Sequence, residues 1–130
     1  MGGGRLLLGA TPLGQPSDAS ARLMSALESA DVVAAEDTRR VRTLATALGA
    51  RITGKVVSLF DQNEAARVPS LVAAMKSGAT VLAVTDAGTP VVSDPGYRLV
   101  TVCIAEGVPV SCLPGPSAVT TALAVSGLPS

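Results

Sequence analysis

Five short apolar runs alternate with stretches of helical periodicity, and this alternation restricts the fold more than any other feature of the sequence. The runs predict strands at residues 5–10, 31–35, 55–60, 80–85 and 110–113. The intervening stretches predict helices at residues 18–30, 38–48, 64–77, 97–106 and 117–125. Such β–α units favour a sheet with right-handed crossovers and helices on both faces. We therefore predict a three-layer α/β domain with a mostly parallel five-stranded sheet over residues 5–130, preceded by a flexible tail at residues 1–4.

The composition is that of a single domain whose sheet is buried on both faces. Apolar residues make up 48% of the 130 residues, yet the chain has one Phe, one Tyr and no Trp. The core must therefore be aliphatic, which is typical of a parallel sheet covered by helices. The net charge is zero, and we find neither a secretory signal nor an apolar run of roughly 18 residues. We expect a cytoplasmic protein that does not enter a membrane.

The residue inventory excludes several kinds of chemistry. The chain has no histidine, which removes the usual general base, the usual zinc ligand and every Ser-His-Asp or Cys-His arrangement. Cys103 and Cys112 lack metal-ligand spacing and are too few for a disulfide framework. We predict two buried thiols and no metal site. Any chemistry here must use carboxylates, hydroxyls, backbone amides or a cofactor.

Ligands of an open parallel sheet bind beyond the carboxyl ends of its strands, so the loops after the first, second, fourth and fifth strands are of interest. The first loop, at residues 9–16, has two glycines at the spacing of a phosphate-binding loop. However, Gln15 and Pro16 replace the lysine and the hydroxyl residue that such a loop requires, and no G-x-G-x-x-G pattern is present. Triphosphate hydrolysis is rejected and a dinucleotide is disfavoured. A stiff turn close to a ligand and a plain βα turn both remain open.

The second loop places two acids before a cluster of arginines. Asp37 or Thr38 can cap the helix that Gly49 ends, but a cap does not explain why Glu36 is also acidic, nor the arginines at 39, 40 and 42. Arginines beside a ligand edge favour phosphate groups. A cap and a site are equally good interpretations of this loop.

The third and fourth loops have compositions suited to holding a ligand. The third, at residues 85–96, needs about ten residues before its helix, whereas most βα loops have two to six. It combines prolines, glycines, two acids and an apolar pair, which can surround a ligand that is partly polar and partly apolar. In the fourth, at residues 113–118, Ser117 can cap the last helix, whose free amides then face the same edge.

Taken in order, these segments resemble the N-terminal domain of the tetrapyrrole methylase superfamily, and within it the small-subunit ribosomal RNA 2′-O-ribose (cytidine) methyltransferases. The segments that carry the resemblance are GATPLGQPSD, ADVVAAEDTRR, LFDQNE, VTDAGTPVVSDPGY and LPGPSAVTTALAVSGLPS, which together cover nearly the whole chain. Each is weak alone, but the combination is highly specific. Two departures exist: Gln15 replaces an Asn, and the LFDQNE segment lacks the family's histidines, which argues against chemistry in that segment.

The resemblance implies a two-domain methylase that binds S-adenosyl-L-methionine in a cleft between its domains, of which this chain is one wall. Its cofactor contacts carry over to positions in the first, third and fourth loops, namely Pro12, Gly14, Gly88, Thr89, Val92, Ser117 and Ala118. The implied partners are small-subunit ribosomal RNA or the assembled subunit, the chain's own C-terminal domain, and a second copy in a homodimer. The 130 residues alone are expected to be inactive.

Catalysis is expected to rest largely on alignment of the methyl donor with the acceptor hydroxyl. A carboxylate near a ribose hydroxyl could accept its proton, and Glu36 and Asp37 are the candidates, with Asp86 third. Arg39 and Arg40 are the candidates for holding RNA phosphates.

Two alternatives remain. One is a C-methyltransferase of a tetrapyrrole or corrin precursor, which the AEDTR and DAGTP segments disfavour. The other is a non-catalytic ligand-binding or docking module, because a fold alone does not fix a function.

Overall fold

The structure, a computed structural model, describes residues 3–10, 21–60, 62–85 and 97–113. Its strands are β1 (Arg5–Ala10), β2 (Val32–Ala35), β3 (Lys55–Ser58), β4 (Thr80–Thr85) and β5 (Val110–Cys112). Its helices are α1 (Ala21–Ser29), α2 (Thr38–Leu48), α3 (Glu64–Lys76) and α4 (Tyr97–Ala105). None of the described helices is long and apolar enough to span a membrane. The helix predicted at 117–125 lies outside the described residues, and the division into a tail and a domain stays a prediction.

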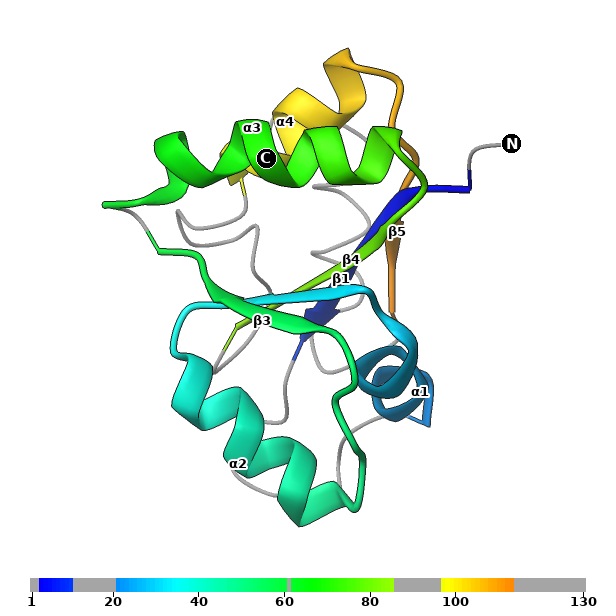
Figure 1. Cartoon of the computed structure of the whole chain (residues 1–130), viewed down its shortest axis with the longest axis vertical. Helices are drawn as coiled ribbons and strands as arrows, with labels where there is room; N and C mark the ends of the chain where they lie inside the picture. Colours follow the sequence, from blue (N-terminus) through cyan, green and yellow to red (C-terminus); the bar gives the residue numbers. More distant parts are fainter. Residues whose placement is uncertain (1–2, 11–20, 61, 86–96, 114–130) are drawn as a thin grey trace.

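The strands form one sheet in the order β3-β2-β4-β1-β5, and every described pair is parallel. Helices α3 and α4 cover one face, and α1 and α2 cover the other (Figure 1). The predicted three-layer α/β fold is therefore confirmed.

Successive side chains of each strand enter opposite halves of the core, as the two-residue period of a strand requires. In β1, Leu6 and Leu8 pack beneath α3 and α4, while Leu7 packs against α1 and α2. In β4, Val81 and Leu82 divide in the same way. Fully burying a side chain of this size stabilises the fold by about 1.5–3 kcal/mol relative to leaving it exposed. Because both faces of the central strands are apolar, β1, β2 and β4 read as nearly continuous apolar runs, and their positions were predictable.

Polar side chains set the ends of two elements that were predicted slightly too long. Asp31 makes two hydrogen bonds with Thr80, one through its backbone N–H (2.9 Å) and one through its carboxylate Oδ2 (2.8 Å), and β2 begins one residue later. The strand predicted at 55–60 ends at Ser58, so that prediction was wrong for its last two residues. The N–H of Phe60 donates to Oδ1 of Asn63 at 2.8 Å, which bends the chain into α3.

Gly49 ends α2, as expected from the sequence. Its φ of 75° is left-handed, and its N–H bonds back to carbonyls of the last turn. Helices 18–30, 64–77 and 97–106 and strand 110–113 were each predicted one residue too long at the carboxyl end, while residues 18–20 lie outside the described part.

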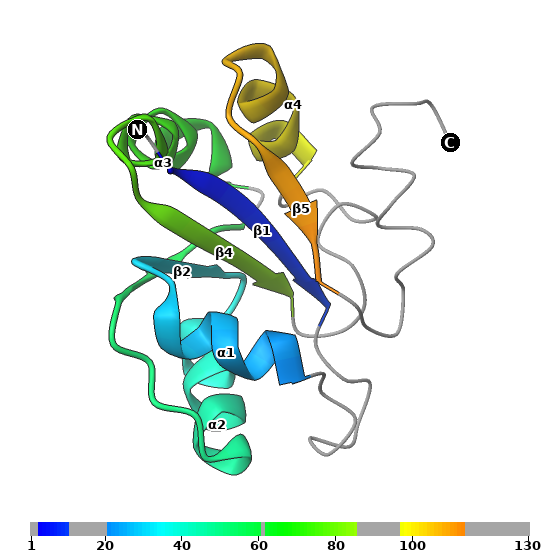
Figure 2. The same ribbon diagram turned by 90° about the vertical axis from the view of Figure 1, so that its right-hand side faces the viewer.

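The two central strands send their crossovers in opposite directions. From β1 the chain passes through α1 on one face to β2, whereas from β4 it passes through α4 on the other face to β5. Figure 2 shows β1 and β4 side by side with these helices on opposite sides. The carboxyl ends of β1 and β4 therefore form the topological switch point of the sheet, which is where open α/β sheets bind ligands.

Candidate functional site

The register of the sheet brings the starts of the four predicted loops to one edge. Ala10 at the end of β1 pairs with Thr85 at the end of β4, so the first and third loops leave from neighbouring positions. On one side Ala35 of β2 pairs with Val84 of β4, and on the other Cys112 of β5 pairs with Leu8 of β1. Parallel pairing explains this convergence, since all carboxyl ends meet at the same edge.

The predicted cofactor residues themselves lie outside the described residues. This applies to Pro12, Gly14, Gly88, Thr89, Val92, Ser117 and Ala118, and also to Asp86. Their roles stay predictions. The structure describes the strand ends from which their loops start.

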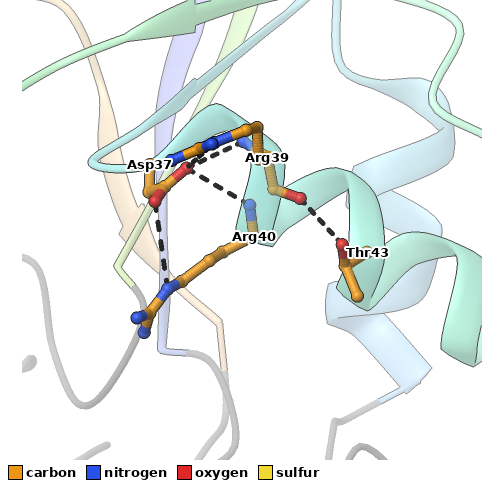
Figure 3. Close-up of polar contacts among 4 residues, drawn as sticks. All are labelled: Asp37, Arg39, Arg40 and Thr43. Atoms are coloured by element: carbon orange, nitrogen blue, oxygen red, sulfur yellow. Dashed lines mark hydrogen bonds and ion pairs between the residues drawn. The ribbon is translucent and has the colours of Figure 1, made fainter.

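The β2–α2 turn confirms the cap interpretation of Asp37. Asp37 has an extended backbone (φ −125°, ψ 109°), and its Oδ1 accepts hydrogen bonds from the N–H groups of Arg39 at 2.9 Å and Arg40 at 3.4 Å (Figure 3). The bond from the Arg39 N–H is the main reason that the pKa of this carboxyl is lowered, with the Arg40 N–H and both guanidinium charges adding to it. A lowered pKa favours the ionised cap and makes Asp37 a weaker proton acceptor.

Asp37 also forms ion pairs with two arginines of the cluster. The Nε of Arg39 lies 3.7 Å from Oδ1, and the Nε of Arg40 lies 3.9 Å from Oδ2. The two arginine side chains are 90% and 72% exposed, so these ion pairs are surface pairs that contribute little to stability. Both arginine side chains are therefore largely exposed to solvent despite these ion pairs.

Glu36 lies between β2 and the Asp37 cap. It follows Ala35, the last residue of β2, and its side chain is exposed. Because Ala35 pairs with Val84, Glu36 lies beside the end of β4, where the third loop begins. Of the two predicted catalytic carboxylates, Glu36 is the one that does not cap α2.

The turn between β3 and α3 also lies at this edge, although the sequence did not predict it as part of the site. Asn63 holds the turn through Phe60, as described above, and its Nδ2 donates to the backbone oxygen (3.1 Å) and the Oγ (3.2 Å) of Ser58. The next residue, Glu64, is 4% exposed, and its Oε2 accepts a hydrogen bond from the N–H of Leu99. In the first turn of α3, the buried Nε of Arg67 has no hydrogen-bond partner in the part of the chain that is described.

A signal for Glu64 was present in the sequence. Buried residues of α3 recur at the spacing of one helical face, and Glu64 belongs to that series with Val68, Leu71, Val72 and Met75. An acid on the apolar stripe of a helix requires a buried partner. The partner itself is 35 residues further along the chain and could not be inferred from spacing.

Neither metal chemistry nor a disulfide is apparent in the described residues. They contain no group of three or more His, Cys, Asp or Glu side chains able to hold a metal ion. Cys103 and Cys112 are both free thiols, with Cys103 buried as predicted and Cys112 only partly buried. Burial raises the pKa of the Cys103 thiol to about 11.

A parallel sheet whose loops start at a topological switch point defines an α/β domain of the class that binds ligands at this edge. A profile of the family Tetrapyrrole (Corrin/Porphyrin) Methylases matches residues 6–130, and the chain belongs to this family.

Known proteins resemble the chain over almost its whole length. It is 73% identical over 130 residues to "Ribosomal RNA small subunit methyltransferase I" of Mycobacterium tuberculosis (strain ATCC 25618 / H37Rv), covering 100% of this chain and 46% of that protein. A protein of the same name from Thermotoga maritima is 42% identical over 126 residues, covering 97% of this chain and 56% of its own length. The chain thus spans about half the length of these relatives.

A solved structure agrees with the fold. The crystal structure of uroporphyrin-III-C-methyltransferase from Thermus thermophilus superposes with a TM-score of 0.66 at 25% identity, covering 97% of this chain and 54% of that one.

Proposed function

We propose that this chain is one wall of the S-adenosyl-L-methionine site of an enzyme that methylates the 2′-oxygen of a cytidine in small-subunit ribosomal RNA. The observation that carries the proposal is the 73% identity, across all 130 residues, to a protein named as a ribosomal RNA small subunit methyltransferase. The 25% identity to a porphyrinoid methylase is much lower, which favours RNA over a tetrapyrrole as the substrate. The expected setting is the cytoplasm, and a homodimer stays a prediction.

The switch point suits the proposed cofactor. Gly9 and Val84, one residue before the ends of β1 and β4, are small, apolar, buried and in register. A nucleoside cofactor that carries a sulfonium and an amino-acid group is suited by apolar walls and backbone polar groups. When bound, it supplies the methyl group. We place its contacts at Pro12, Gly14, Gly88, Thr89, Val92, Ser117 and Ala118 of the flanking loops.

The described residues would bind and orient the RNA. Arg39 and Arg40 present exposed guanidinium groups that can hold phosphates beside the edge. Glu36, between those arginines and the end of β4, is our preferred acceptor for the proton of the ribose hydroxyl. Asp37 would orient α2 by capping it.

The decisive experiment uses this sequence extended by the C-terminal part of the 73% identical mycobacterial relative. Small ribosomal subunits, their naked RNA and a uroporphyrinogen-type substrate are each incubated with methyl-labelled S-adenosylmethionine. We expect label in the ribosomal RNA at a ribose 2′-oxygen. Label in the porphyrinoid alone would refute the RNA assignment, and no binding of cofactor in calorimetry would refute the methylase assignment and favour a docking module. The unextended chain is expected to bind cofactor weakly or not at all.

Variants of the same extended protein separate the proposed roles. Glu36→Gln should lower turnover on the order of a hundredfold, within the range expected for a general base, while RNA affinity stays unchanged. Arg39→Ala and Arg40→Ala should each weaken RNA binding and reduce the slope of log affinity against log salt concentration by about 1, leaving cofactor affinity intact. Full turnover in Glu36→Gln would remove Glu36 from the mechanism.

A further inference from the structure

Glu64 is the only buried charged residue in the part of the chain that the structure describes. It begins α3 at the carboxyl edge of the sheet and shares the apolar stripe of that helix with Val68 and Val72. Placing a carboxylate in such surroundings is costly unless its oxygens are hydrogen-bonded. A leucine or methionine would suit the packing better, so the carboxylate must have a specific partner.

That partner is the first turn of a different helix. The Oε2 of Glu64 accepts a hydrogen bond from the N–H of Leu99 at 3.2 Å. Leu99 is the third residue of α4, and the first N–H groups of a helix have no acceptor within the helix. Leu99 is fully buried, so water does not readily substitute. Glu64 thus caps α4 from the neighbouring helix and fixes the position of its first turn against α3.

The first turn of α4 is where the third loop ends. That loop, residues 86–96, runs from β4 to Tyr97 and contains the proposed cofactor residues Gly88, Thr89 and Val92. Its start is fixed by the pairing of Thr85 with Ala10. Its end is fixed by α4, and therefore by Glu64. We propose that Glu64 is a positioning residue of the cofactor site, which holds the downstream anchor of the third loop in place. This inference rests on the proposed function.

The helix pair provides its own control. At the opposite end of α3, the Nζ of Lys76 bonds and ion-pairs with the carboxylate of Glu106, just beyond α4. Both of those side chains are well exposed. The α3–α4 pair is therefore held at both ends, but only the Glu64 end adjoins the loop. A variant at Glu106 perturbs the same two helices away from the site.

The test varies the length and the charge of the side chain at position 64 separately, in the extended protein. Glu64→Asp keeps the charge but shortens the side chain by one methylene, whereas Glu64→Gln keeps the reach and an acceptor oxygen. Glu106→Gln is the matched control. Calorimetry gives the Kd for S-adenosylmethionine, steady-state methylation separates KM from kcat, and hydrogen exchange follows the amide of Leu99.

We expect Glu64→Asp to raise the Kd and the cofactor KM about tenfold with a smaller change in kcat, because a displaced loop end would misalign groups that bind the cofactor, and losing the equivalent of about one hydrogen bond lowers affinity roughly tenfold. Glu64→Gln should restore the affinity to within about threefold of the wild type, because a neutral acceptor weakens the bond without displacing it. Glu106→Gln should bind as the wild type does. In Glu64→Asp the Leu99 amide should exchange faster.

Two failures can be told apart. If the wild-type extended protein does not bind S-adenosylmethionine, the proposed function fails and takes this inference with it. If the wild type binds and Glu64→Asp binds equally well, the inference alone is overturned and Glu64 only stabilises the fold. The inference is also overturned if Glu64→Asp and Glu106→Gln weaken binding equally. If Glu64→Asp does not fold, Glu64→Gln decides instead. The inference is overturned if this variant exchanges its Leu99 amide at the wild-type rate and yet has a Kd raised more than tenfold.

Discussion

Removing the side chain of Asn63 should unfold the β3–α3 turn locally and lower the stability of the whole domain. Asn63 precedes α3, yet its side chain does not cap that helix. Instead it accepts a bond from the N–H of Phe60 (2.8 Å) and donates to the backbone oxygen (3.1 Å) and hydroxyl (3.2 Å) of Ser58. One amide side chain therefore links the end of β3 to the start of α3.

The size of the effect follows from those bonds. A typical intramolecular hydrogen bond contributes about 0.5–1.5 kcal/mol net. The bonds to the two backbone groups dominate in Asn63→Ala, because the Ser58 hydroxyl can rotate toward another partner. The variant should lose about 2 kcal/mol, which is a fall of about 6–10 °C in Tm for a chain of this size. Asn63→Asp keeps an acceptor for Phe60 but turns a carboxylate oxygen toward the Ser58 carbonyl, so it should lose at least about 1 kcal/mol.

Urea unfolding followed by circular dichroism measures this on the 130-residue chain. The slope of free energy against urea should stay constant while the midpoint falls. Gln62→Ala is the matched control, since Gln62 is the exposed neighbour in the same turn and should stay within about 0.5 kcal/mol of the wild type. An Asn63→Ala protein as stable as the control, or an Asn63→Asp protein as stable as the wild type, would refute the linking role.

Three further predictions each concern one or two residues. Asp37→Asn keeps the α2 cap but loses the charge, so it should lower the melting temperature at neutral pH by less than Asp37→Ala does. Because the folded pKa of Asp37 is lowered, its ionisation stabilises the wild type above pH 3.8, and this contribution disappears as the pH falls through the folded pKa. Thermal melts of wild type and Asp37→Asn should therefore differ at neutral pH and converge in acid. Pro69→Ala should raise the free energy of unfolding by about 1–2 kcal/mol in urea titrations, because Pro69 is exposed inside α3 and its ring interrupts the helical hydrogen bonding. This figure is net of the stability that is lost when the unfolded chain becomes more flexible without the proline. In alkylation at about pH 8 followed by mass spectrometry, Cys103 (pKa about 11, fully buried) should react more slowly than half-buried Cys112, and denaturant should abolish the difference.

The centre of the sheet was predictable because its strands are buried on both faces. Residues such as Leu6, Leu7 and Leu82 must all be apolar when helices cover both sides, so β1, β2 and β4 appear in the sequence as nearly uninterrupted apolar runs. The edge strands β3 and β5 are less buried, and each includes a serine. The edge of the candidate site was predictable for a related reason, since parallel strands bring all their carboxyl ends together. The strand order was not, because nothing in β1 alone specifies that β4 and β5 will be its neighbours.

The missed features depend on contacts between residues that are distant in sequence or that compete locally. The end of β3 is decided by Asn63, whose side chain bonds the N–H of Phe60 as α3 begins. Propensity favours a strand through Leu59 and Phe60, and the turn overrides it. Glu64 and Leu99 meet only because α3 and α4 lie on the same face of the sheet. For Asp37 the sequence left a cap and a site equally open, and the structure confirms the cap.

The described part of the edge divides by charge, and the division constrains how RNA could approach. Gly9 and Val84, which pair just before the ends of β1 and β4, are small and apolar, whereas the exposed guanidinium groups of Arg39 and Arg40 lie one strand away, beyond β2. In the proposed complex, a phosphate held by those arginines would allow its ribose to lie between them and the switch point. Glu36 lies in that interval, since the residue before it pairs with β4. A porphyrinoid with several carboxylates could also be attracted by the arginines, but it would offer no hydroxyl proton for Glu36 to accept. Dependence of turnover on Glu36, together with label at a ribose 2′-oxygen, is therefore the result that the proposed oxygen methylation predicts for this edge.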